Sequence, residues 1–231
     1  IIAFRGSFHG RTWGAMSVTG SAAKYRHSYQ PCMGGVYFAT YPQKDLCPKG
    51  FDEEQRSEYC LNDLQQIFDY LVSPEEVAAI IMEPVQGEGG YFVPPASFVQ
   101  GVRKMCDEHG ILLIFDEIQS GYGRTGKMWA GQNFGVTPDI MNLGKAIAGG
   151  MPMSAVVSTH EIMSRWHPGM HGGTFGGNPV AAAAALAVLD EFERQDILSN
   201  VNKMGDYLGE KLKKLAADHP VVGDVRGIGL M

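Results

Sequence analysis

The sequence lacks several features that would assign it to a specialised class of protein. No apolar run in its 231 residues approaches the roughly 18 residues that a membrane-spanning helix needs. It has no block of like charges and a formal net charge of −6, which argue against nucleic acid or an anionic membrane as the main partner. With 45% hydrophobic and 19% charged residues, its composition is that of a soluble globular protein.

Cysteine is scarce and follows no pattern. The four cysteines are Cys32, Cys47, Cys60 and Cys106, with no Cys-x-x-Cys pair among them and no nearby histidines that would complete a zinc site. We therefore expect free thiols in a reducing compartment, a cytoplasmic location and no bound metal.

Neither end of the chain has the polar character of a frayed terminus. Residues 1–5 lack the pattern of a signal peptide and resemble a core strand already under way. Residues 225–231 end the chain where we expect another strand to begin. We therefore expect the chain to be a fragment of a longer protein, cut at both ends.

Apolar runs alternating with amphipathic segments predict an α/β fold in a single domain over residues 1–231. The expected strands are 36–40, 77–82, 111–115 and 155–158, and the expected helices are centred on 61–71, 98–106, 179–192 and 197–217. A helix between fully apolar strands is typical of a parallel βαβ unit. Ligands of such sheets bind beyond the carboxyl ends of the strands, where we expect Glu83 and Asp116.

Asp116 and Lys145 have the chemistry that a pyridoxal-phosphate site needs. Asp116 directly follows an apolar strand, and Lys145 lies in the glycine-rich stretch 142–150. A lysine packed among apolar side chains has a lowered pKa and can form a Schiff base with the cofactor aldehyde. A carboxylate facing the ring nitrogen keeps the ring protonated, and Glu117 should then point the opposite way. Spacing alone leaves simpler interpretations open: a surface lysine on a short helical turn and an aspartate that caps the next turn.

Five motifs, in order, resemble those of the class III aminotransferases, the ω-aminotransferase group of fold-type I pyridoxal-phosphate enzymes. They are FHGRT at 8–12, EPVQGEGG at 83–90, DEIQSGYGRTG at 116–126, PDIMNLGKAIAGGMP at 138–152 and HGGTFGGNP at 171–179. Within the family, the resemblance is closest to 4-aminobutyrate aminotransferases. It implies the large domain of the fold-type I transferases, with a mostly parallel central sheet flanked by helices.

The resemblance also implies roles for individual residues at the cofactor. Lys145 corresponds to the Schiff-base lysine, which also moves a proton as general base and acid. Asp116 corresponds to the partner of the ring nitrogen. The remaining cofactor contacts that it implies are Phe8 and Ile118 on the two ring faces, Gln119 at the ring hydroxyl, His9 beside Phe8, Glu83 as an active-site carboxylate, and Thr174 at the phosphate of the neighbouring subunit of a homodimer.

Two further residues are implied to contact substrate. Arg11 corresponds to an arginine that holds the α-carboxylate of glutamate or 2-oxoglutarate, a task that suits a guanidinium fork. Without the motif, a solvated surface arginine is the simpler interpretation. Glu88 corresponds to the carboxylate that serves as a gate in this family by pairing with a second substrate-binding arginine. The sequence does not contain that arginine. The sequence also has no equivalent of the family's main phosphate-binding turn, so we expect this chain alone to bind the cofactor weakly.

The implied activity is transfer of an amino group from an ω-amino acid or similar amine, such as 4-aminobutyrate, to a keto acid such as 2-oxoglutarate. Two alternatives remain open. One is an amino-acid racemase or epimerase on the same scaffold, since both reactions begin with proton removal at the substrate carbon. The other is a catalytically incomplete fragment that dimerises.

Overall fold

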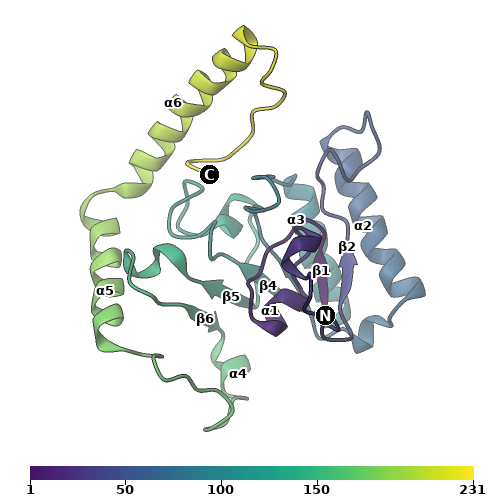
Figure 1. The fold of residues 1–231 in the computed structure, drawn as a ribbon, viewed down its shortest axis with the longest axis vertical. Helices are drawn as coiled ribbons and strands as arrows, with labels where there is room; N and C mark the ends of the chain where they lie inside the picture. The colour runs from purple at the N-terminus through teal and green to yellow at the C-terminus, as the bar shows by residue number, and fades with distance from the viewer. The chain divides into compact units, whose positions relative to one another are not determined.

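The computed structural model describes all 231 residues, and Figure 1 draws their helices and strands. The chain forms two compact units. The first unit comprises Ile1–Asp116 and Gly131–Pro138, and the second comprises Glu117–Ala130 and Asp139–Met231. No helix combines the length and the apolar character that crossing a membrane requires. Because the first unit includes Asp116 and the second begins at Glu117, the peptide bond between them is one of the points where the chain passes between the units.

The first unit is built on four parallel strands in the order β2-β1-β3-β4. Their bounds are β1 Ile2–Phe4, β2 Tyr37–Ala39, β3 Ala79–Met82 and β4 Leu112–Asp116. Every residue of β1 and β3 is buried, which explains why both strands are continuous apolar runs rather than alternating ones. Because the strands are parallel, the residues that follow β1, β3 and β4 emerge at the same edge of this sheet.

Two helices pack on these strands. Helix α2 (Glu53–Tyr70) contacts β2 and helix α3 (Ala96–His109), and α3 also contacts β4. Asp52 begins α2 with a capping box, because its side chain accepts from the Gln55 backbone and Gln55 returns a bond to the Asp52 backbone. Gly110 ends α3 with φ 67°, a left-handed conformation that glycine adopts without steric cost.

A buried tyrosine joins the core of the first unit to the end of β3. The rings of Phe4, Tyr41 and Phe98 meet edge to face, with centroids 5.5 to 6.0 Å apart. The Tyr41 hydroxyl donates to the carbonyl oxygens of Glu83 (3.3 Å) and Pro84 (3.2 Å). Burial raises the pKa of Tyr41 well above its usual value, so this hydroxyl remains a donor and fixes the backbone at Glu83.

The second unit contains an antiparallel pair of strands and the long C-terminal helices. Strands β5 (Ile140–Leu143) and β6 (Ala155–Ser158) pair with each other. The helices are α4 His160–Met163, α5 Pro179–Arg194 and α6 Ile197–Asp218, and a 3₁₀ turn, η4, covers Lys145–Ala148. Leu143, Ile147, Ala148 and Ala185 form a buried cluster that packs η4 against α5. Three short elements belong to the first unit: α1 Trp13–Ser17, η1 Ala23–Tyr25 and η2 Pro74–Glu76. The 3₁₀ turn η3, Ala130–Asn133, lies where the chain passes from the second unit to the first.

The α/β class and the mostly parallel strands are confirmed, and the expected strands and helices are present. Helix α2 begins at Glu53, two turns before the expected 61, and the other elements lie within about three residues of their predicted bounds. The strand expected at 225–231 is wrong. This segment forms turns, with Gly227 at φ 149° and Gly229 at φ 60°, which a strand does not allow. Instead, the Leu230 backbone N–H donates to the carbonyl of Arg124 at 2.9 Å. Strand β5 was not anticipated.

Candidate active site

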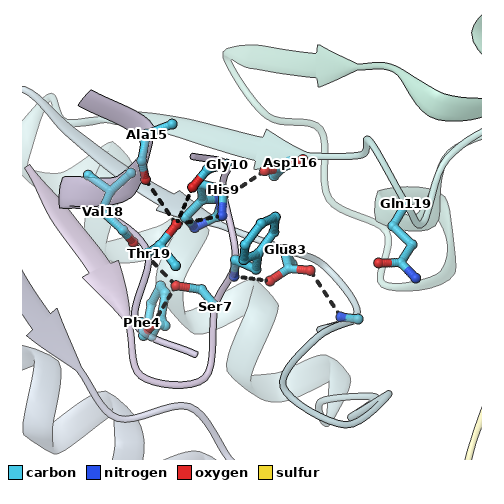
Figure 2. Close-up of polar contacts among 12 residues, drawn as sticks. Phe4, Ser7, His9, Gly10, Ala15, Val18, Thr19, Glu83, Asp116 and Gln119 are labelled. Atoms are coloured by element: carbon cyan, nitrogen blue, oxygen red, sulfur yellow. Dashed lines mark hydrogen bonds and ion pairs between the residues drawn. The ribbon is translucent and has the colours of Figure 1, made fainter. Parts of the chain in front are cut away.

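The turn after β1 carries three of the predicted site residues, Phe8, His9 and Arg11. It is pinned by hydroxyl groups: Ser7 Oγ donates to the carbonyl of Phe4 at 2.6 Å, and Thr19 Oγ1 accepts from the His9 backbone at 3.0 Å (Figure 2). Thr19 Oγ1 also donates to the carbonyl of Ala15 at 2.9 Å. The side chains that follow therefore project from a fixed backbone.

His9 and Asp116 form a buried pair at the end of β4. His9 Nδ1 lies 2.7 Å from Asp116 Oδ2, and the two side chains are only 2% and 5% exposed. A carboxylate can only accept, so Nδ1 carries the proton and donates it. The other ring nitrogen, Nε2, is buried and has no hydrogen-bond partner. The pair thus orients one carboxylate oxygen within a dry environment.

Glu83 ties two loops together at the end of β3. Its Oε1 accepts from the Phe8 backbone at 2.8 Å, and its Oε2 accepts from the Gly87 backbone at 3.0 Å (Figure 2). The pKa of this carboxyl is raised to about 7, mainly by burial and to a smaller extent by the Asp116 charge, while the two backbone donors and His9 oppose the shift. Glu83 therefore connects the turn that carries Phe8 to the loop that carries Glu88.

Arg11 and Glu88, the two residues expected at the substrate, both contact Tyr25. The Arg11 guanidinium carbon lies 4.7 Å from the centroid of the Tyr25 ring and 5.8 Å from that of Phe8. The Tyr25 hydroxyl donates to Glu88 Oε2 at 3.2 Å, and its ring meets Phe8 edge to face at 5.2 Å. One tyrosine therefore contacts residues from two of the motifs, Phe8 and Arg11 from the first and Glu88 from the second.

Lys145 opens η4 in the second unit. Its backbone has φ 45°, a left-handed conformation that is uncommon outside glycine, and its Nζ donates to Gln119 Oε1 at 3.1 Å. Gly144, the residue before it, lies against Ile118: a Cβ at Gly144 would sit 3.4 Å from two Ile118 carbons. The second unit thus brings together Ile118, Gln119 and Lys145.

The burial predicted for Lys145 is wrong, because its side chain is exposed. In the short turn η4, Ile147 and Ala148 face the core while Lys145 and Ala146 face outward. The simpler interpretation, a surface lysine on a short helical turn, therefore describes its local structure. The argument for imine formation from apolar packing of this lysine does not hold.

Glu117 takes a different environment from Asp116, as the alternation of side chains predicted. It is fully buried, and its Oε2 accepts from Ser120 Oγ at 2.8 Å and from the Ala130 backbone at 3.0 Å. Its own backbone N–H donates to the carbonyl of Asn142 at 3.0 Å, three residues before Lys145. Glu117 therefore stabilises the loop that follows it, whereas Asp116 pairs with His9.

Comparison with known proteins identifies the family. The profile of the class-III aminotransferases matches residues 1–231. The chain is a class III aminotransferase sequence. It is 44% identical to 4-aminobutyrate aminotransferase GabT of Escherichia coli (strain K12) and 41% identical to leucine/methionine racemase of Thermococcus litoralis, each over 231 residues, all of this chain and 52% of the relative. The family resemblance inferred from the five motifs is confirmed.

Solved structures give the same assignment. An amine transaminase from an uncultivated Pseudomonas species, solved in a PLP-bound form, matches with a TM-score of 0.92 and 37% identity. The match covers 99% of this chain and 53% of that chain. This class III aminotransferase chain thus spans about half the length of the curated relatives it matches.

Thr174 and Tyr25 are the two residues at which the structure and the sequence analysis of this class III chain differ most. Thr174 is exposed, in the irregular segment between α4 and α5. Tyr25 was missed by the sequence analysis. It lies in the short turn η1, where no periodicity marks it, and its partner Glu88 is 63 residues away. Only the folded chain shows that it joins Arg11, Phe8 and Glu88.

Proposed function

We propose that the protein is a pyridoxal-phosphate-dependent aminotransferase that moves an amino group from an ω-amino acid, such as 4-aminobutyrate, to a keto acid such as 2-oxoglutarate. The observation that carries this proposal is the buried His9–Asp116 pair at the end of β4, in a chain whose entire length matches the class III family. A buried carboxylate that an imidazole orients through a hydrogen bond is a suitable partner for a pyridinium nitrogen.

The residues present fit pyridoxal phosphate. When bound through its aldehyde to Lys145, this cofactor supplies an electron sink for the electrons released at the substrate carbon. Asp116 would hold the ring nitrogen protonated, with His9 fixing the orientation of the carboxylate. Phe8 and Ile118 would pack on the two ring faces and Gln119 would approach the ring hydroxyl. Glu83 supports this arrangement through the backbone of Phe8.

Lys145 would act as the general base and acid of the reaction. Its Nζ would take the proton from the substrate carbon and return it at the next step. The left-handed backbone at Lys145 supports a functional role, since a non-glycine residue held in this region costs about 1 kcal/mol or more and such residues cluster at active sites. The exposed amine also needs no rearrangement of the core to reach a ligand.

The remaining assignments belong to the same proposal. Arg11 would hold a substrate carboxylate, and Glu88 would act as the gate beside it. The chain would be the cofactor-binding large domain of a cytoplasmic homodimer, in which Thr174 contacts the cofactor phosphate of the neighbouring subunit. The exposed position of Thr174 is compatible with a contact to a second chain.

The test is a pair of half-reactions with the intact protein and saturating cofactor. Adding 4-aminobutyrate alone should bleach the visible absorption of the bound cofactor, and adding 2-oxoglutarate afterwards should restore it. A nitrogen label on the donor should then appear in glutamate. If no primary amine transfers its nitrogen to any keto acid, the proposed function is wrong.

A racemase is the second candidate, because the Thermococcus litoralis relative named for that activity is 41% identical to this chain. Arg11, Asp116 and Lys145 would serve either reaction, since both begin with removal of a proton at the substrate carbon. The two differ in their need for a keto acid. Inversion of an amino acid in solvent deuterium, with deuterium incorporation and no keto acid added, would favour the racemase.

A further inference from the structure

Tyr25 is held in place from two sides by residues of the first unit. Its ring meets the edge of Phe8 at a centroid distance of 5.2 Å, and its hydroxyl donates to Glu88 Oε2 at 3.2 Å. The Tyr25 side chain is partly buried, whereas both Arg11 and Glu88 are exposed. A packed aromatic ring thus lies next to two charged side chains that water surrounds.

The Arg11 guanidinium uses this ring as a platform. Its central carbon lies 4.7 Å from the Tyr25 centroid, within the range of a cation–π contact. The Lys24 ammonium is a second cation, 5.0 Å from the same centroid. The hydroxyl of this ring donates to an anion, Glu88, so the ring carries cations at its surface and an anion at its tip.

Stacking leaves the arginine free to bind a carboxylate. A guanidinium contacts an aromatic ring through its flat face, whereas its N–H donors lie at its edge. An exposed arginine without such a platform samples many rotamers, and it must lose that freedom when it binds. Holding the fork in advance therefore lowers the cost of binding, mainly for ligands that carry a carboxylate.

We propose that Tyr25 is the residue that positions Arg11 for a substrate carboxylate, with Phe8 and the Glu88 hydrogen bond holding the tyrosine ring in place. This inference rests on the proposed aminotransferase function and on the role of Arg11 in it. Tyr25 acts through Arg11 and takes no part in the chemistry itself. Its removal should weaken the binding of substrates that carry an α-carboxylate and spare substrates without one.

The experiment compares Tyr25→Leu and Tyr25→Phe with the wild-type intact protein loaded with cofactor. The half-reaction is measured with glutamate and with 4-aminobutyrate, which is glutamate without its α-carboxylate. Tyr25→Leu should lower kcat/KM for glutamate about threefold to tenfold, as expected from the loss of a cation–π contact and of the ordering it gives, and raise the KM for 2-oxoglutarate by a similar factor. Its kcat/KM for 4-aminobutyrate should stay within about twofold of wild type.

Two variants separate positioning from damage to the fold. Tyr25→Phe keeps the ring and its contact with Phe8, so its kcat/KM for glutamate, the donor with an α-carboxylate, should stay close to that of wild type. Tyr29→Leu, at an exposed tyrosine of the same segment, should leave both donors unchanged. An equal loss for both donors in Tyr25→Leu, or no loss for either, would overturn the inference.

Binding of 2-oxoglutarate measured by calorimetry distinguishes this inference from the proposed function. If the wild-type protein transaminates no donor, the proposed function fails. If Tyr25 positions Arg11, the affinity of Tyr25→Leu for 2-oxoglutarate should still be at least about threefold lower than that of wild type. Equal affinities would refute the role of Tyr25 whether or not the protein is a transaminase.

Discussion

Replacing Glu83 with glutamine should change how the stability of the protein depends on pH. The Glu83 carboxyl is 4% exposed and accepts backbone N–H groups from Phe8 and Gly87. Burial is the largest cause of its raised pKa, which is about 7 in the folded protein against an ordinary value of 4.5. The folded protein therefore binds this proton more tightly than the unfolded chain does.

The size and sign of the effect follow from these two values. The difference between a pKa of 4.5 and one of about 7 corresponds to about 3 kcal/mol. This stabilisation is fully present below pH 4.5 and is lost as the pH rises through about 7. Glutamine does not titrate, so Glu83→Gln lacks this loss. Between about pH 5 and pH 8, the unfolding free energy of wild type should fall by about 2.5 kcal/mol relative to the variant.

Urea unfolding of both proteins across this pH range measures the effect. At low pH the unfolding free energy of the variant should be lower than that of wild type by about 1 to 3 kcal/mol, because the glutamine NH₂ faces one of the two backbone donors and leaves that donor without an acceptor. Glu88→Gln, on the same loop but exposed, corrects for the removal of one negative charge. A stability difference between wild type and Glu83→Gln that does not change with pH would refute the reasoning.

Two other features of the first unit lead to further predictions. His9→Leu should lower the unfolding free energy by about 1.5 to 3 kcal/mol, because it removes a hydrogen bond to the buried Asp116 carboxylate; a loss below about 0.5 kcal/mol in urea unfolding would contradict this. Cys32, the partly exposed thiol, should react first with a disulfide reagent at neutral pH, because burial raises the pKa of both Cys47 and Cys60. Equal reaction rates at Cys32, Cys47 and Cys60 would contradict this prediction.

The regular elements could be predicted because their signals are local. The helix before Gly110 has apolar residues at helical spacing and ends at a glycine in the left-handed conformation that such ends favour. The strand that follows is a continuous apolar run. Asp116 directly follows this run, which predicted its position at the end of the strand, and the structure puts it there, 5% exposed and paired with His9. The pairing itself was not predicted, because the two residues are 107 positions apart.

The errors come from features that spacing does not determine. The glycines at 227 and 229 lie within an apolar run, but their positive φ values turn the chain away from a strand. Lys145 stands between apolar residues, yet a 3₁₀ turn directs only Ile147 and Ala148 to the core. Strand β5 contains Asn142 and has no fully buried residue before Leu143, so its composition does not distinguish it from a loop. Its hydrogen bonds with β6 make it a strand.

The covalent bond between Lys145 and pyridoxal phosphate is the central claim, and borohydride reduction tests it most directly. The intact protein is saturated with the cofactor, reduced, digested and mapped by mass spectrometry. We predict that the reduced pyridoxyl group is found on Lys145 and on no other lysine. A cofactor attached to a different lysine, or an unmodified Lys145 after reduction at saturation, would contradict the account.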